Sequence, residues 1–288
     1  MTNLTRSAGI RPIPVSPRSA AIMVLASLGG LMMFFWPLLV SVAPTPQQHV
    51  ADAPFEFVLI LPVLVLLVLS QLADGGIDSK ALAMLGVLSA INAGLRPLGA
   101  GLDGIETVFF LLILAGRVFG PGFGFTLGCT SMFASALLTA GVGPWLPFQM
   151  ICSAWIGLGA GLLPHRIGGR AITGRREIAM LAGYGVLVAY LFGLLMNLFF
   201  WPFVTGATMG DHAGLAYIPG GPLGENLRRF LVFTLITSTA SWDTGRAITN
   251  ATAIVVLGAA ILAVLRRAAR RAQFDPVVEF LPDADTPA

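Results

Sequence analysis

The chain is poor in charged residues and contains a single lysine, Lys80. Charged residues make up 11% of its 288 residues, against roughly a quarter in soluble domains. Hydrophobic residues make up 56%, and the mean hydropathy is +0.84. This composition excludes an ordinary soluble domain and is typical of a polytopic membrane protein. Because the apolar runs are long and do not alternate with polar residues, we expect spanning helices rather than a barrel.

Sequence signatures of catalysis and of ion coupling are also missing. Lys80 is not part of a phosphate-binding glycine loop, the histidines form no HExxH motif, and no serine stands in a GxSxG motif. No series of carboxylates crosses the apolar segments, as a proton- or sodium-driven pump usually requires. We therefore expect no catalytic residue and no catalytic cofactor. If the protein moves a solute, the energy is expected to come from a partner.

Cysteine is scarce, and the basic residues form no nucleic-acid surface. Cys129 and Cys152 both lie in apolar segments without metal-ligand spacing, so we expect inert packing residues and no metal site. Basic residues outnumber acidic ones by 17 to 14, but no basic stripe interleaved with aromatic residues is present. A nucleic-acid partner is therefore not expected.

The sequence does contain a regular series of apolar segments. We predict spans at 20–43, 55–72, 80–95, 105–119, 122–141, 147–163, 178–203 and 245–266. The shorter apolar stretch 230–241 is interpreted as an interfacial or re-entrant helix that leads into the last span. With eight spans, most of the 17 basic residues fall on the side of the N-terminus, which predicts that both chain ends are cytoplasmic.

These segments predict an all-α polytopic membrane protein with four parts. A cytoplasmic N-terminal segment, 1–19, precedes a transmembrane helix pair within 20–79. A membrane core of six helices follows at 80–271, and we treat the helix pair as an appendage to it. The acidic, proline-bearing tail at 272–288 is expected to be disordered.

Polar and aromatic residues recur near the outer ends of the predicted spans. Four amides from four spans share one depth: Asn92, Gln149, Asn197 and Asn250. Three tryptophans lie at the same level: Trp145, Trp201 and Trp242. Because polar residues inside a membrane are costly, the set predicts a pocket in which amides orient a polar organic ligand and indole rings cover it. The alternative is an interfacial tryptophan belt with amides that bond one helix to another.

Small residues recur every four positions on three spans. Gly185, Ala189 and Gly193 form one stripe, and Gly157 and Gly161 form another. We expect both to pack against neighbouring helices inside the chain. The third stripe, formed by Gly86, Ala90 and Gly94, could equally face another subunit.

Four strings of the core resemble the substrate-binding S component of energy-coupling factor (ECF) vitamin transporters. They span Ala90–Pro97, Gly116–Gly128, Gly141–Met150 and Thr237–Ala247, within a region of about 80–271. The resemblance implies a six-helix fold that binds a vitamin at the external side and works with a membrane coupling subunit and two ATPases. It implies that the first core helix, here with Gly86, Ala90 and Gly94, docks on the coupling subunit. That family typically has an Ala-x-x-x-Ala pattern there, and the N-terminal helix pair is a further departure.

Among S components, the Gly-Pro-Trp and Ser-Trp-Asp strings look most like those of the cobalamin group. Cobalamin needs a wide mouth, many amide contacts and aromatic cover, which the four amides and three tryptophans fit. Arg96 and Asp243, from the first and last strings, join them as candidate ligand-binding residues. A pterin, purine or flavin would also fit these residues.

Two other functions stay open at the level of sequence. A self-sufficient secondary transporter would need a coupling-ion site, for which Asp103, Glu106 and Asp243 are the nearby acids. A membrane enzyme or assembly factor would rely on Asp243 with Arg246, or on Asp211 with His212, for acid–base chemistry.

Overall fold

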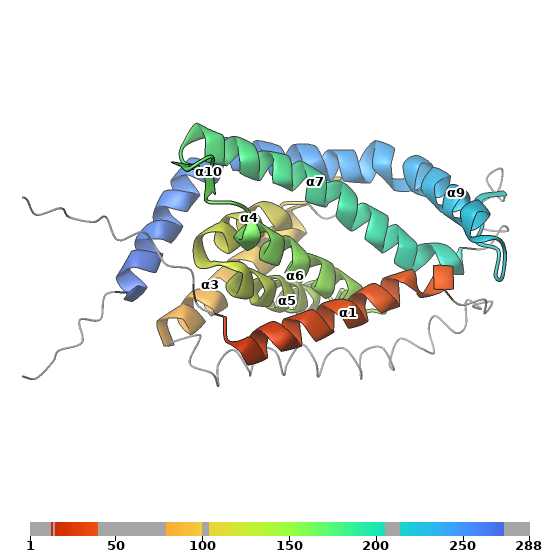
Figure 1. Ribbon diagram of the computed structural model, residues 1–288, viewed down its shortest axis with the longest axis horizontal. Helices are drawn as coiled ribbons and strands as arrows, with labels where there is room; N and C mark the ends of the chain where they lie inside the picture. Colours follow the sequence, from red (N-terminus) through yellow and green to blue (C-terminus); the bar gives the residue numbers. More distant parts are fainter. Residues whose placement is uncertain (1–12, 14, 40–78, 100–103, 205–213, 274–288) are drawn as a thin grey trace, which may run out of the picture.

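The computed structural model describes residues 13, 15–39, 79–99, 104–204 and 214–273 (Figure 1). Within these ranges the chain is helical, apart from a short antiparallel hairpin of β1 (Arg166–Ile167) and β2 (Arg170–Ala171). The hairpin adds a small exception to the predicted all-α fold. The predicted span at 55–72 and most of the tail predicted at 272–288 lie outside the described residues.

The described helices follow the predicted spans to within a few residues at most ends, apart from α9 (Leu223–Thr234), which begins ahead of the predicted stretch 230–241. They are α1 (Pro17–Leu39), α3 (Ser79–Leu95), α4 (Val108–Phe119), α5 (Pro121–Leu138), α6 (Leu146–Leu162), α7 (Arg175–Phe200), α9 (Leu223–Thr234) and α10 (Thr244–Gln273). Short 3-10 turns, η1 (Arg96–Gly99) and η2 (Trp201–Phe203), extend α3 and α7. In the described residues, five helical runs are long and apolar enough to span a membrane: Pro17–Phe35, Ser79–Gly99, Pro121–Leu138, Arg175–Phe203 and Leu223–Arg271.

The short helix α4 lies at the centre of the molecule. Every residue from Val108 to Phe119 is buried, and the helix packs on α3, α5, α6, α7 and α10. An apolar helix of about 10–14 residues is more typical of a buried core than of a lipid-facing span. Burial therefore explains why the predicted span at 105–119 is short.

Glycines bring α4, α5 and α6 into backbone contact. A Cβ at Gly157 would meet the backbone of Gly124, and one at Gly161 would meet Gly120 and Pro121. The predicted internal packing of Gly157 and Gly161 is thus confirmed. The stripe on α7 is confirmed as well, since Ala189 is fully buried, Gly185 faces Ile254, and Gly193 faces Asp243.

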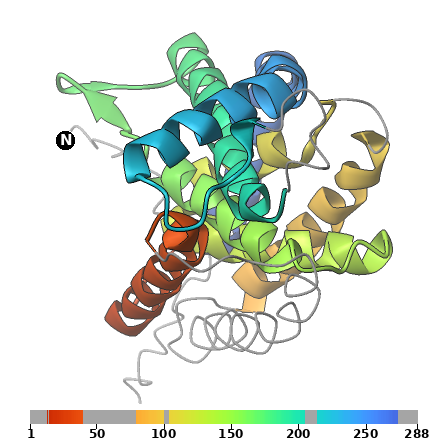
Figure 2. The same ribbon diagram turned by 90° about the vertical axis from the view of Figure 1, so that its right-hand side faces the viewer.

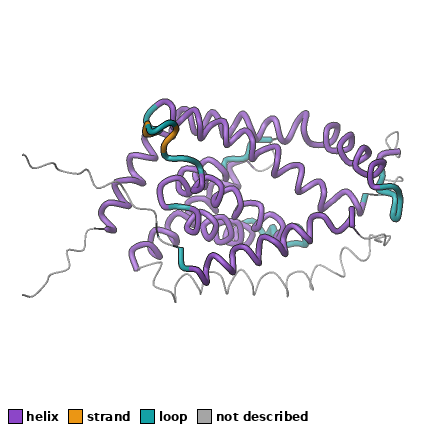
Figure 3. Tube along the Cα trace, viewed as in Figure 1, coloured by secondary structure: helices purple, strands orange, loops and turns teal. Residues whose placement is uncertain are grey.

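The last helices form one continuous helical run, which lies beside α7 and bends downward at the left in Figures 1 and 3. Between α9 and α10 the backbone continues as a π-helical segment, η4 (Leu235–Asp243), without a break. The prediction of a separate interfacial helix at 230–241 was therefore wrong in its boundaries. Polar residues such as Thr237, Ser238 and Ser241 lower the hydropathy there, but they do not interrupt the helix.

Helix α1 packs directly on the core. The ring of Phe34 is fully buried, with its centroid 5.0 Å from that of Phe148 and 6.0 Å from that of Trp155. The indole nitrogen of Trp155 donates a 2.9 Å hydrogen bond to Ser27 Oγ. The described half of the predicted N-terminal pair is thus joined to α6 by specific contacts.

The two ends of the molecule differ in charge. The β1–β2 hairpin, the start of α7 and the arginine-bearing end of α10 lie at the left in Figure 1, and α9 lies at the opposite end, which faces the viewer in Figure 2. Arg166, Arg170, Arg175 and Arg176 all belong to the left-hand end. By the positive-inside rule, we expect this end to be cytoplasmic and the α9 end to be external.

Candidate functional site

A cleft opens between the end of α7 and the segment α9–η4. Its volume is about 680 Å³, within the range of roughly 300–1,000 Å³ that is usual for small-molecule sites. It is lined by Gly193, Met196, Asn197, Phe200, Phe203, Val204, Phe233, Thr237, Ser238, Trp242, Asp243 and Arg246. The lining combines aromatic walls with a polar base, an arrangement that can hold a flat organic molecule with polar substituents.

The π-helical segment shapes the polar base of this cleft. Residues five apart point to different faces of an α-helix, but the wider π turn aligns them. Ser238 Oγ consequently donates a 2.5 Å hydrogen bond to Asp243 Oδ2. The Thr244 hydroxyl donates to Thr239 O over the same five-residue spacing, at 2.6 Å. Such π turns are frequent at functional sites, because they redirect side chains that a regular helix would leave apart.

Arg246 connects this cleft to the interior. Its Nη1 donates a 2.8 Å hydrogen bond to Asp243 Oδ1, and its Nε donates to Glu106 Oε2. Its guanidinium carbon lies 4.8 Å from the centroid of the Phe192 ring, a cation–π distance. The sequence suggested Arg246 only as a partner of Asp243 in acid–base chemistry and gave it no role in ligand binding. Its three-residue spacing from Asp243, typical of a helical ion pair, was the signal available.

A second polar group lies between α3 and α6. Arg96 Nη2 donates a 2.9 Å hydrogen bond to Gln149 Oε1, and Asn92 Nδ2 donates one of 3.0 Å to Ser131 Oγ on α5. Thr107, next to Glu106 in the chain, donates a 2.8 Å hydrogen bond to Leu95 O, next to Arg96. The segment before α4 thus connects the end of α3, beside Arg96, with Glu106 and its partner Arg246.

Asn250 joins the segment before α4 to α10. Its Nδ2 donates to the backbone oxygens of Glu106, at 3.0 Å, and of Arg246, at 2.8 Å. We call the set Arg96, Gln149, Glu106, Ser238, Asp243, Arg246 and Asn250 the outer polar network. Its two guanidinium groups and two carboxylates balance in charge, as buried ionic groups require.

Several buried polar atoms in and around this network lack a hydrogen-bond partner among the described residues. They are Asn92 Oδ1, Arg96 Nη1, Asn197 Nδ2 and Asn250 Oδ1. An unsatisfied buried polar atom costs about 1–3 kcal/mol. All four belong to residues that the sequence selected as ligand-binding candidates. The amides thus have a mixed role, because Asn92 and Asn250 also bond one element to another.

The tryptophans do not act as one group. Trp242 lines the cleft and is 45% exposed. Trp201 is fully buried, donates to Leu215 O at 2.9 Å, and packs on Tyr217 and Phe230. Trp145 is exposed outside the cleft and donates to Gly141 O at 3.2 Å.

The structure locates some of the remaining residues that were named from the sequence. Cys129 and Cys152 are buried, as predicted. Gly86, Ala90 and Gly94 are exposed on α3, and a Cβ at either glycine would meet no atom within 4 Å. Asp103, Asp211 and His212 lie outside the described residues. Among the described residues, no group of three or more His, Cys, Asp or Glu side chains could hold a metal ion.

Comparison with protein families identifies the chain. The model of the family described as "ECF transporter, substrate-specific component" matches residues 80–242, more than half of the chain. No curated protein and no solved structure matches it. S components associate with the energizing module of an ECF transporter. The chain therefore belongs to the substrate-specific (S) component family of ECF transporters, and it is a multi-pass cell-membrane protein that binds a transport substrate rather than an enzyme.

Proposed function

We propose that the cleft and the outer polar network together form the substrate site of this S component. The site captures a vitamin at the external face, and the protein delivers it inward with a membrane coupling subunit and two ATPase subunits. The observation that carries the proposal is Asn197 Nδ2, a donor without a described partner in a residue that lines the cleft. Asp243 and Arg246 at the same cleft continue into the outer polar network.

The cleft favours a ligand with a flat body and polar edges. Phe200, Phe203, Phe233 and Trp242 offer aromatic surface, while Asn197, Thr237 and Ser238 offer hydrogen-bonding groups. A few placed polar groups in an apolar, concave site fix the orientation of a ligand and provide specificity. The balanced charge of the network favours a neutral or zwitterionic substrate over a strongly charged one.

Cobalamin is our specific candidate, on the resemblance of the Gly-Pro-Trp and Ser-Trp-Asp strings. Trp242 supplies aromatic cover in the cleft, whereas Trp201 packs inside the core and Trp145 lies outside the cleft. This reduces the physical support for a corrin face and raises that for a smaller pterin, purine or flavin ring. A corrin with its peripheral carboxamides would require the cleft to widen, for example by movement of α9 and η4 away from α7.

We also propose that α3 docks on the coupling subunit. Gly86, Ala90 and Gly94 leave a flat, exposed stripe on this helix. Small residues four apart allow close approach of a second helix in a membrane. The matching stripes on α6 and α7 are occupied by neighbours within the chain, which leaves the α3 stripe available to a partner.

Calorimetric titration of the purified chain tests the substrate assignment. The protein, without nucleotide or partner subunits, would be titrated with cobalamin, riboflavin, folate and the other B vitamins. We expect one member to bind with a stoichiometry near one. A folded protein, verified by cooperative thermal unfolding, that bound no member of the panel would overturn the assignment.

A further inference from the structure

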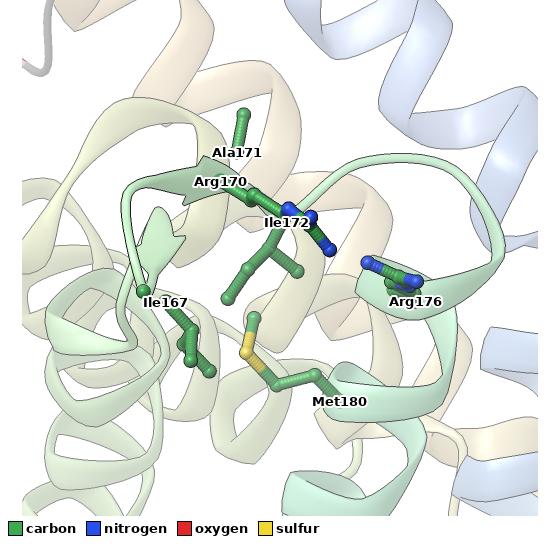
Figure 4. A pocket seen from close by; sticks show the side chains of 7 residues that line it. Ile167, Arg170, Ala171, Ile172, Arg176 and Met180 are labelled. Carbon is green, nitrogen blue, oxygen red and sulfur yellow. The ribbon is translucent and has the colours of Figure 1, made fainter.

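A second cleft lies at the opposite end of α7 from the substrate cleft. It has a volume of about 510 Å³ and sits between the β1–β2 hairpin and the first turns of α7 (Figure 4). Its lining residues are Ile167, Gly168, Arg170, Ala171, Ile172, Arg176 and Met180. We call it the hairpin cleft. It shares no lining residue with the substrate cleft and has no part in the outer polar network.

Two arginines converge on the hairpin cleft from different elements. Arg170 comes from β2 and Arg176 from the first turn of α7, and their guanidinium groups point toward one another in Figure 4. Neither has an ion-pair partner among the described residues. The carboxylate next in sequence, Glu177, is buried and already paired with Arg117 at 2.8 Å and Arg266 at 2.7 Å. The cleft therefore carries positive charge that no described carboxylate neutralises.

The start of α7 adds to this positive potential. The residue before the helix is Gly174, with φ of 60°, and no side chain caps the first N–H groups of the helix. Uncapped N–H groups and the helix dipole favour an anion at this position. Arg176 belongs to the first turn of this helix, so the helix start adds its positive potential close to one of the two guanidinium groups that line the cleft.

The rest of the cleft is apolar and lies at the membrane boundary. Ile167 is 64% exposed although it borders the arginines, and Ile172 and Met180 form the floor. The candidate span on α7 begins at Arg175, so the cleft lies where lipid headgroups are expected. A positively charged site beside exposed apolar side chains at this depth suits a phospholipid. The phosphate headgroup would lie at the arginines, and the first part of the acyl chains would lie on the apolar side chains.

We propose that the hairpin cleft binds the phosphate headgroup of an anionic phospholipid in the cytoplasmic leaflet. Arg170 and Arg176 hold the phosphate, and Ile167, Ile172 and Met180 contact the apolar part of the lipid. Basic pockets at the cytoplasmic ends of membrane helices are known to bind headgroups in this way. The site is independent of the substrate site, so it stands even if the proposed vitamin binding fails.

Native mass spectrometry of the full chain, released from nanodiscs, tests the proposal. The nanodiscs would contain phosphatidylcholine with or without phosphatidylglycerol, and retained lipid would be quantified. The test variant is Arg170→Gln with Arg176→Gln. The control is Arg175→Gln with Arg267→Gln, which removes the same charge from exposed arginines that do not line the cleft.

We expect the wild-type chain and the control to retain phosphatidylglycerol in preference to phosphatidylcholine. The test variant should lose this preference by about tenfold, as expected for the loss of two charge-assisted contacts. Equal loss in both variants would overturn the proposal, because net charge alone would then explain retention. Displacement of the lipid by millimolar inorganic phosphate, with no preference between the two lipids, would contradict a lipid ligand and indicate a soluble phosphate instead.

Discussion

Arg246 is the residue that determines the geometry of the outer polar network. It bonds carboxylates from two elements, Asp243 at the end of η4 and Glu106 in the segment before α4, and it stacks on Phe192 of α7. Removing one partner of such a buried set leaves an uncompensated charge, which costs about 3–5 kcal/mol. Glu106 and Asp243 are two of the acids that a secondary transporter could use for ion coupling. Each is paired with Arg246 in this structure.

Gly193 is the residue that makes room for Asp243. A Cβ at this position would overlap the carboxylate of Asp243, which would have to leave Ser238 and Arg246. We expect Gly193→Ala to lower the free energy of unfolding by about 1–3 kcal/mol, the usual cost of overpacking. Thermal unfolding in detergent measures the effect.

Gly86→Ala is the matched control, since the same change on α3 meets no atom within 4 Å. Its effect should be neutral or slightly stabilising, because alanine favours a helix by about 1 kcal/mol over glycine. Similar melting temperatures for the two variants would contradict the close contact between α7 and η4.

At the residue scale, sequence reasoning found the depth of the candidate side chains but not their direction. Trp201 and Asn197 are four residues apart near the end of α7, yet one packs inside the core and the other lines the cleft. Because residues around these spans are apolar on most faces, the pattern does not indicate which face is the interior. The role of Arg246 was missed because its environment depends on Glu106, which is distant in sequence.

At the scale of elements, the arginine-rich ends of α4, α7 and α10 are joined by one buried carboxylate. Glu177 accepts from Arg117 on α4 and from Arg266 on α10, and Arg117 also donates to Leu163 O at 2.8 Å. Sequence analysis counted Arg117 only as a charge that sets orientation. The structure shows that it is buried and holds helices together.

Glu177→Gln should therefore destabilise the protein strongly. It leaves two arginines without their counter-charge, at a cost of about 3–5 kcal/mol for a buried pair. Glu225→Gln is the control, because its pairs with Arg228 and Arg229 lie on the surface. An exposed ion pair contributes little to stability, because water and salt screen its charges. Chemical or thermal unfolding that gave equal losses for both variants would be inconsistent with a helix-joining role for Glu177.

The exposed stripe of α3 gives a prediction about assembly. Gly86→Leu and Ala90→Leu should leave substrate affinity unchanged and prevent co-purification with the coupling subunit, because leucine side chains hold two helices apart. Gly183→Leu on α7 is the control, since this glycine is also exposed with no atom within 4 Å of a Cβ. Gel filtration should show the complex for the control only. An intact complex with the α3 variants would remove this helix from the interface.

Element positions followed well from hydropathy, but their ends did not. Helix α7 begins at Arg175, and α10 continues through Arg271 to Gln273, beyond the predicted limits of 178 and 266. Hydropathy falls at the membrane boundary, whereas backbone hydrogen bonding continues into water when the residues favour a helix. Within the stretch 230–241, the polar residues Thr237, Ser238 and Ser241 likewise lower the hydropathy although the helical backbone continues.

At the scale of the whole molecule, segments distant in sequence meet at two separate sites. One end brings together α3, α6, α7, η4 and α10 around polar atoms, and the opposite, arginine-rich end presents the hairpin cleft. Helix α7 connects the two, with Gly193 and Asn197 in one cleft and Arg176 and Met180 in the other. This arrangement places the proposed substrate site and the proposed lipid site at opposite ends of one helix.

The central claim is that the cleft beside the outer polar network holds the substrate. Its most direct test is the substrate affinity of Asn197→Ala and Trp242→Ala, compared by calorimetry with that of Trp145→Ala. Trp145 is 42% exposed and Trp242 is 45% exposed, but only Trp242 lines the cleft. Trp145 is therefore the control, although the sequence suggested a ligand-binding role for both residues. We predict affinities at least about tenfold weaker for the two cleft variants, or roughly 1.4 kcal/mol, and an unchanged affinity for Trp145→Ala. Equal affinity in all three proteins would contradict the account.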